Sequence, residues 1–168
     1  ARMTPIAPEK TSRLRVLTRL GFWFTLLIGF LLPWAIMLGV DTWVHDVPLA
    51  RAWRSFTLHL FAPGYNLFLV GVLTAIPFVV LALVMLLHLG TIPSQQALIA
   101  HRRALGLLSA EFVMLTIAGW THVSVLVHPD AQGALAYFYL PALLLISLPL
   151  GYGVGRALAK ALLPRLTP

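Results

Sequence analysis

NLFLVGVLTAIPFVVLALVMLLHL, residues Asn66–Leu89, is a stretch without a single Asp, Glu, Lys or Arg. A helix needs about 20 mainly apolar residues to cross the hydrocarbon core of a bilayer, because each residue advances the helix axis by about 1.5 Å. This stretch is long enough and apolar enough to do so. It therefore predicts a transmembrane helix.

Three further stretches have the same character, namely Leu20–Val40, Ala104–Val127 and Ala134–Leu158. Of all 168 residues, 60% are hydrophobic and 10% are charged, with a mean hydropathy of +0.90. A soluble domain averages about 45–50% apolar and about 25% charged residues, so this chain has too few polar side chains to cover a soluble core. The sequence predicts an all-α integral membrane protein, with one four-helix transmembrane domain at 20–158 between basic tails at 1–19 and 159–168.

Proline and glycine residues inside the spans predict their shape and packing. A proline lacks a backbone donor and tends to bend its helix, so we expect kinked helices. The prolines within the spans are Pro33, Pro77, Pro141 and Pro149. In the fourth span a cluster of glycines permits close contact with another helix. These glycines are Gly151, Gly153 and Gly155.

The basic residues predict the orientation of the spans, because cytoplasmic segments retain Lys and Arg. Ten of the 12 lie on one side, in the N-terminal tail, in the connection between the second and third spans, and at the C-terminal end of the chain from Arg156 on. We therefore expect both termini in the cytoplasm, Arg51 and Arg54 outside, and the protein in the cytoplasmic (inner) membrane. The basic side chains are too sparse for a nucleic-acid site, and their expected partner is the anionic lipid surface. The predicted lipid-surface contacts are Arg13, Arg15, Arg19, Arg102, Arg103, Arg156 and Lys160.

The connection between the first two spans contains an amphipathic segment at about residues 48–62, where apolar and polar side chains separate at the period of a helix. The apolar side holds Leu49, Trp53, Phe56 and Leu60. The polar side holds Arg51, Arg54, Ser55 and His59. Proline at 48 suits a first helical turn, and Pro63-Gly64 ends the helix. We expect a short interfacial helix in the outer headgroup region. The alternative is the beginning of a long second helix that breaks at Pro63.

Glu111 lies inside the third predicted span, about two turns from its cytoplasmic end, where a carboxyl group must be protonated, paired or next to water. His122 follows eleven residues later, almost three whole turns, so both side chains project from one helix face. One interpretation makes Glu111 a proton-handling group or a contact to a quinone or substrate. The other makes it structural, bonded to a carbonyl that a proline leaves free, or paired with Arg102 or Arg103.

The histidines offer two candidate pairs for a b-type haem, which needs two imidazoles from facing helices at similar depth. His59 and His122 lie toward the outer side, and His88 and His101 lie toward the cytoplasmic side. Because three of the four lie at the ends of helices, the alternative is that they are ordinary solvated side chains. The sequence contains no His-Glu-x-x-His zinc motif and no cysteine.

The run His101–Gly106, in a span that closes with Gly119-Trp120-Thr121-His122, is similar to the third helix of small four-helix b-type cytochromes. The similarity covers about 22 residues. The in-span histidines that this family carries on its other helices are missing, so no function is carried over.

The sequence has neither the phosphate-binding loop of nucleotide hydrolases nor the Gly-x-Ser-x-Gly motif of serine hydrolases. Polar residues inside the spans are scarce, and no catalytic site is expected. The leading hypothesis is therefore a non-catalytic integral subunit that packs against other integral subunits in a larger membrane complex, respiratory or otherwise energy-transducing. One alternative is a small electron-transfer subunit, with quinone near Glu111 or b-type haem on His122 and His59. Another is a transporter or channel component that uses Glu111.

Overall fold

The computed structural model describes residues 8–64, 66–91, 97–129 and 133–162, and in these ranges it contains five helices and no strand. The helices are α1 (Pro8–Trp43), α2 (Leu49–His59), α3 (Leu67–Gly90), α4 (Ala97–Val127) and α5 (Gly133–Leu162). All except α2 are long and apolar enough to span a membrane. The predicted all-helical architecture with four candidate spans is therefore confirmed.

The long helices extend beyond the predicted spans. The helix α1 begins at Pro8 rather than near Leu20, and α4 begins at Ala97 rather than Ala104. The helix α5 ends at Leu162 rather than Leu158, so part of each basic tail is helical. The reason is that hydrophobicity marks only the apolar part of a helix, whereas backbone hydrogen bonding continues through charged residues that favour helix. The beginning of α3 is close to its prediction, because the Asn66 side chain accepts a hydrogen bond from the Leu69 amide at 2.9 Å.

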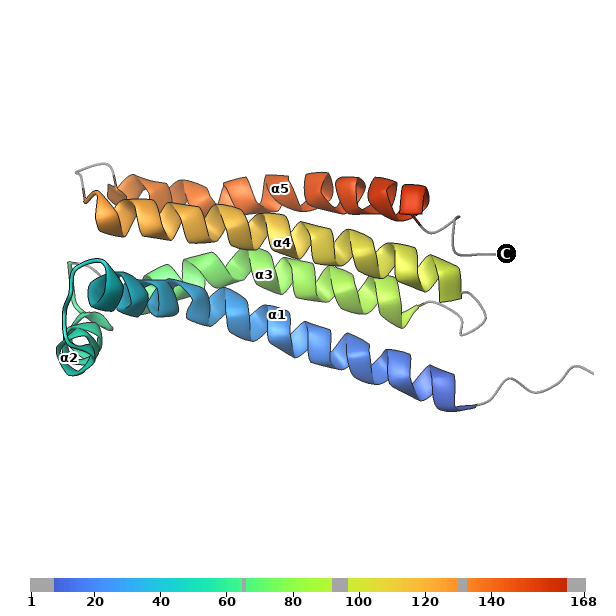
Figure 1. Ribbon diagram of the computed structural model, residues 1–168, viewed down its shortest axis with the longest axis horizontal. Coiled ribbons are helices and arrows are strands. Elements are labelled where there is room, and N and C mark those ends of the chain that lie inside the picture. Colours follow the sequence, from blue (N-terminus) through green and yellow to red (C-terminus); the bar gives the residue numbers. More distant parts are fainter. Residues whose placement is uncertain (1–7, 65, 92–96, 130–132, 163–168) are drawn as a thin grey trace, which may run out of the picture.

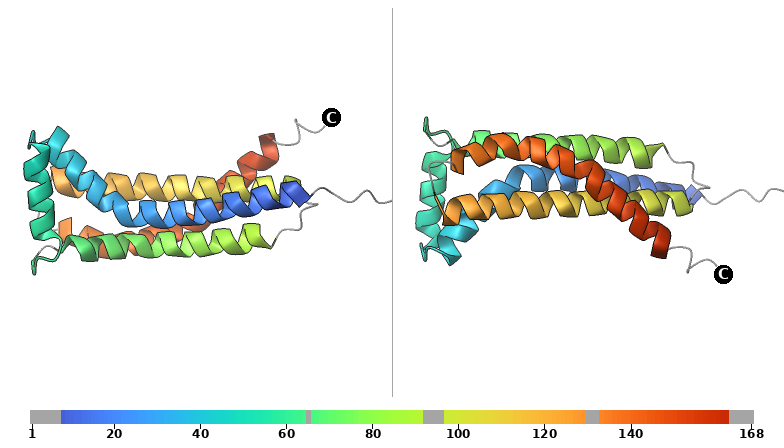
Figure 2. Two further views of the ribbon diagram at one scale, coloured as in Figure 1. Left: turned by 90° about the horizontal axis from the view of Figure 1, so that it is seen from below. Right: turned by 90° about the horizontal axis from the view of Figure 1, so that it is seen from above.

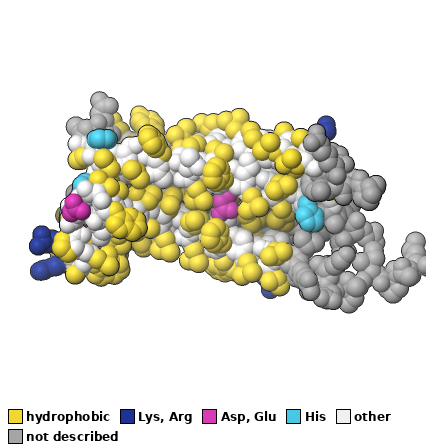
Figure 3. All heavy atoms as spheres, in the orientation of Figure 1, with side chains coloured by type: hydrophobic (Ala, Val, Ile, Leu, Met, Phe, Trp, Pro, Cys, Tyr) yellow, Lys and Arg dark blue, Asp and Glu magenta, His cyan; other side chains and the backbone are white. Residues whose placement is uncertain are grey.

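The four long helices form a bundle built from two antiparallel pairs, α1 with α3 and α4 with α5 (Figure 1). The main core lies where α3, α4 and α5 meet. Its fully buried side chains include Phe78, Leu81, Leu107, Met114 and Leu144. Figure 3 shows apolar side chains along the length of the bundle, with Lys and Arg at its ends. This distribution is the reverse of a soluble protein and matches an apolar solvent around the bundle.

Glycines allow α4 and α5 to approach each other closely. A Cβ atom at Gly151 would lie 2.8 Å from the Cα of Ala110, and one at Gly155 would lie 2.9 Å from the Cα of Gly106. Both contacts are with backbone atoms of α4, which no side-chain rotation can relieve. Nothing lies within 4 Å of a Cβ at Gly153. The packing role predicted for the glycine cluster is therefore confirmed for Gly151 and Gly155.

The prolines do not interrupt the long helices, since α1, α3 and α5 stay helical on both sides of theirs. The kinks at these positions stay a prediction. Figure 2 shows α5 crossing α4 obliquely, so that its C-terminal part lies away from α3. This divergence separates α3 from α5 at the end of the bundle opposite α2.

The helix α2 lies across one end of the bundle (Figures 1 and 2). The predicted separate helix is confirmed, because α2 ends at His59, α3 begins at Leu67, and α2 does not continue the line of α3 as the beginning of a long helix broken at Pro63 would. Its buried residues are Ala52 and Phe56. Trp53 is 54% exposed, so the predicted apolar side does not face the bundle as a whole. Ala52 and Phe56 are one helical turn apart, and burying this pair is enough to hold a short helix against the end of the bundle.

Candidate functional site

Two pairs of polar side chains join helices inside the bundle. In the first, the Thr25 hydroxyl of α1 donates a hydrogen bond to the Glu111 carboxyl oxygen Oε1 of α4, at 2.9 Å. In the second, the Thr74 hydroxyl of α3 lies 3.2 Å from the His122 Nε2 atom of α4. All four residues are buried. Glu111 and His122 share one buried face of α4, as predicted, and each bonds a different neighbouring helix.

Glu111 lies 14 residues after the first residue of α4 and 16 before the last, so it is near the middle of that helix. The predicted depth of two turns refers to the apolar span that begins near Ala104, and it stays a prediction. Thr25 takes the place of the partners that the structural interpretation named. In the described part of the chain, Glu111 forms no ion pair with Arg102 or Arg103, and its carboxyl group is bonded by Thr25 instead.

His122 is enclosed by three helices. Only 1% of its surface is exposed, and its ring centroid lies 5.3 Å from that of Tyr137 on α5. Haem ligation through Nε2 would require Thr74 to move away from the nitrogen. His59, its predicted partner, is exposed on α2, where its Nδ1 atom faces the Ser55 carbonyl at 2.9 Å. The structure thus gives each imidazole a protein neighbour of its own.

The second histidine pair lies at the end of the bundle opposite α2. His88 is half-buried, with its Nδ1 atom 3.1 Å from the Val84 carbonyl and its ring edge-on to Tyr152 at 5.8 Å between centroids. His101 is exposed on α4. Within the described ranges, no three His, Asp or Glu side chains lie close enough together to hold a metal ion. Haem binding by either pair stays a prediction.

The basic residues predicted to contact lipid lie at this same end, where α1 and α4 begin and α5 ends (Figure 1). Arg19 and Lys160 are exposed, whereas Arg102, Arg103 and Arg156 are half-buried. The side chains of Arg13 and Arg15 lie outside the described part of the chain.

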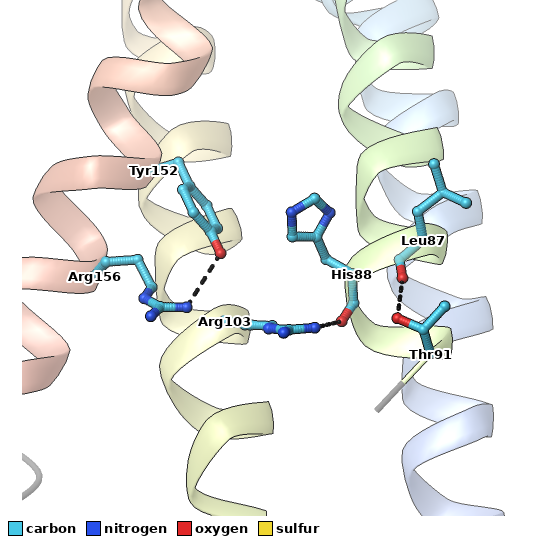
Figure 4. Close-up of a pocket in the computed structure, with 6 residues that line it drawn as sticks. All are labelled: Leu87, His88, Thr91, Arg103, Tyr152 and Arg156. Carbon is cyan, nitrogen blue, oxygen red and sulfur yellow. Dashed lines mark hydrogen bonds between the residues drawn. The ribbon is translucent and has the colours of Figure 1, made fainter. Parts of the chain in front are cut away.

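Two of the half-buried arginines make defined contacts (Figure 4). Arg103 donates to the His88 carbonyl at 3.0 Å, and Arg156 donates to the Tyr152 hydroxyl at 3.4 Å. The His88 carbonyl is near the C-terminal end of α3, where carbonyl groups lack partners within the helix. Arg103 therefore completes the end of α3, and its guanidinium is held in one place.

The sequence interpretation missed Thr25, Thr74 and Tyr152. A hydroxyl inside an apolar span is a weak signal, because it can bond a carbonyl of its own helix, as Thr116 and Thr121 do. Which hydroxyl meets a partner helix depends on the helix pairing, and a single sequence does not contain that information.

No known protein family, curated protein or solved structure matches the chain.

Proposed function

We propose that the chain is a non-catalytic integral subunit of a larger membrane complex. The observation that carries this proposal is the way the interior uses its polar groups: Glu111 and His122 each pair with a threonine of a neighbouring helix. A catalytic site needs several polar groups that converge on one space. Here the polar groups join neighbouring helices, which favours a structural role. Partners would be other integral subunits, in a respiratory or other energy-transducing complex.

The orientation belongs to the same proposal. The basic end faces the cytoplasm, and α2 with Arg51 and Arg54 lies on the outer side of the cytoplasmic (inner) membrane. The positive-inside rule supports this arrangement, since the Lys and Arg residues of three separate segments gather at one end of the bundle.

The α1–α4 seam is the proposed place for a partner helix. Glu111 lies in this seam, where Thr25 bonds one of its two carboxyl oxygens. A carboxyl group is costly in hydrocarbon, so a donor from outside this chain to the other oxygen would stabilise it. The adjacent Phe112 is 71% exposed. Its ring offers an aromatic contact next to the polar anchor.

A photo-crosslinking amino acid tests this seam in native membranes. At Phe112 it should give a protein adduct of one discrete mass, because a fixed partner helix covers the site. The matched control is Ile146, which is 63% exposed and belongs to α5, a helix that does not form the α1–α4 seam. We expect mainly lipid adducts there. Lipid adducts alone at both positions would contradict the subunit proposal.

A second candidate function is proton handling or quinone contact at Glu111, and it is favoured by the burial of this carboxyl group in the middle of α4. Glu111→Gln separates the two proposals, because glutamine still accepts from Thr25 but carries no acidic proton. If the residue only joins helices, the variant complex should assemble and turn over as the wild type does. Normal assembly with lost turnover would favour the proton or quinone role.

A further inference from the structure

An open pocket of about 330 Å³ lies where α5 diverges from α3, at the basic end of the bundle. Figure 4 shows the six residues that line it, drawn from three helices. They are Leu87, His88, Thr91, Arg103, Tyr152 and Arg156.

The pocket carries positive charge that nothing in its lining neutralises. Two of the six residues are arginines, and none is acidic. The described acidic side chains lie elsewhere: Asp41 and Asp46 are at the α2 end, and Glu111 bonds Thr25. Two uncompensated guanidinium groups at a partly apolar surface attract an anion strongly, because the local dielectric is lower than in water.

The polar groups of the pocket are held in place but are not used up. A guanidinium group has five N–H donors, and the contacts shown in Figure 4 use one from each arginine. The Nδ1 atom of His88 faces a carbonyl, which can only accept, so in a neutral ring Nδ1 carries the hydrogen and Nε2 is an acceptor. The donors that remain for an anion are therefore those of the two arginines. The planar guanidinium group of Arg103, held by the His88 carbonyl, suits the oxygens of a phosphate, and Arg156 adds a second guanidinium group.

The surroundings favour a phosphate that belongs to a lipid. Leu87, in the pocket wall, is 65% exposed, and Leu83, one turn along α3 toward the middle of the bundle, is 49% exposed. An acyl chain can lie along this apolar strip while its phosphate occupies the pocket. The lining contains no carboxylate that could hold the ammonium group of a zwitterionic lipid. An anionic headgroup therefore fits better.

We propose that this pocket binds the phosphate group of an anionic phospholipid, with Arg103 and Arg156 as its charge partners and His88 and Tyr152 beside them. The site is specific, in contrast to the diffuse attraction of an exposed basic tail. It does not depend on the subunit role proposed above.

Native mass spectrometry of the full chain in neutral detergent tests the site, with phosphatidylglycerol and phosphatidylcholine titrated separately. Wild-type protein should bind phosphatidylglycerol about tenfold more tightly than phosphatidylcholine, and R103Q/R156Q should lose about tenfold in phosphatidylglycerol affinity. The control R51Q/R54Q removes the same charge from exposed positions on α2 and should change the affinity less than about twofold. Equal binding of the two lipids, or an unchanged double variant, would overturn the proposal.

Two further measurements separate a lipid site from a free-phosphate site and from a folding defect. Inorganic phosphate at millimolar concentration should leave the lipid bound; displacement would show that the pocket recognises free phosphate and would overturn the lipid assignment. Arg103 also bonds the end of α3, so the double variant could fold poorly. In that event the single variant R156Q tests the site. The contact between Arg156 and the Tyr152 hydroxyl is long, so its loss should leave the fold intact. A loss of about threefold or more supports the site, and unchanged affinity overturns it.

Discussion

Gly155→Ala should destabilise the bundle by about 3 kcal/mol or more, the upper range for adding a methyl group to a packed interface. The new Cβ would lie 2.5 Å from the Ser109 Cβ, 2.6 Å from the Leu105 carbonyl oxygen and 2.9 Å from the Gly106 Cα. Two of these atoms belong to the α4 backbone, so α4 and α5 would have to separate. Close backbone approach at small residues is the main source of attraction between helices in a bilayer, where lipid competes for apolar contact.

Gly153→Ala is the matched control for this prediction, because it adds the same methyl group to the same helix two residues away. Nothing lies within 4 Å of a Cβ at this position. Alanine also favours helix over glycine by about 1 kcal/mol, so the control should be neutral or slightly stabilising. Unfolding in mixed detergent micelles with increasing dodecyl sulfate, followed by circular dichroism, measures both variants. Equal stability of the two would show that α4 and α5 do not pack as described.

Thr74→Val should lower the free energy of unfolding by about 1–2 kcal/mol, measured in the same micelle titration. Valine has the shape of threonine, so the change removes the hydroxyl without making a cavity. His122 is only 1% exposed, and its Nε2 atom then loses the Thr74 hydroxyl, which lies 3.2 Å away on α3. A buried nitrogen without a partner is more costly than the hydrogen bond itself is favourable.

The control for Thr74 is Thr116→Val. The Thr116 hydroxyl donates to the Phe112 carbonyl of its own helix at 2.8 Å, and its side chain is exposed. Loss of this hydroxyl should change the free energy of unfolding by less than about 0.5 kcal/mol. If Thr116→Val and Thr74→Val cost the same, the bond between α3 and α4 does not stabilise the bundle.

Hydropathy was enough to predict four spans, because crossing hydrocarbon demands long apolar helices and little else. The amphipathic period likewise predicted α2, and the glycine cluster predicted a close contact. Helix ends were less predictable. Residues such as Arg13 and Arg102 are unfavourable in hydrocarbon and favourable in a helix, so the apolar span and the helix end at different places.

The contacts between helices could not be predicted from one sequence. The position of Glu111 in a span was evident, and so was its shared face with His122, because both follow from helical spacing. Their partners Thr25 and Thr74 lie 86 and 48 residues away along the chain. The pocket at His88, Arg103 and Arg156 joins three helices in the same way. Which helices are neighbours depends on packing, which hydropathy does not encode.

The central claim is that four helices cross the membrane with their basic ends on one side. The sequence has no cysteine, so single cysteines can be introduced without background labelling. Cysteine at Arg19, Arg102 or Lys160 should react with a membrane-impermeant maleimide only after the cells are permeabilised, and cysteine at Arg51 should react in intact cells. Labelling of Arg19→Cys and Arg102→Cys from opposite sides would contradict the account.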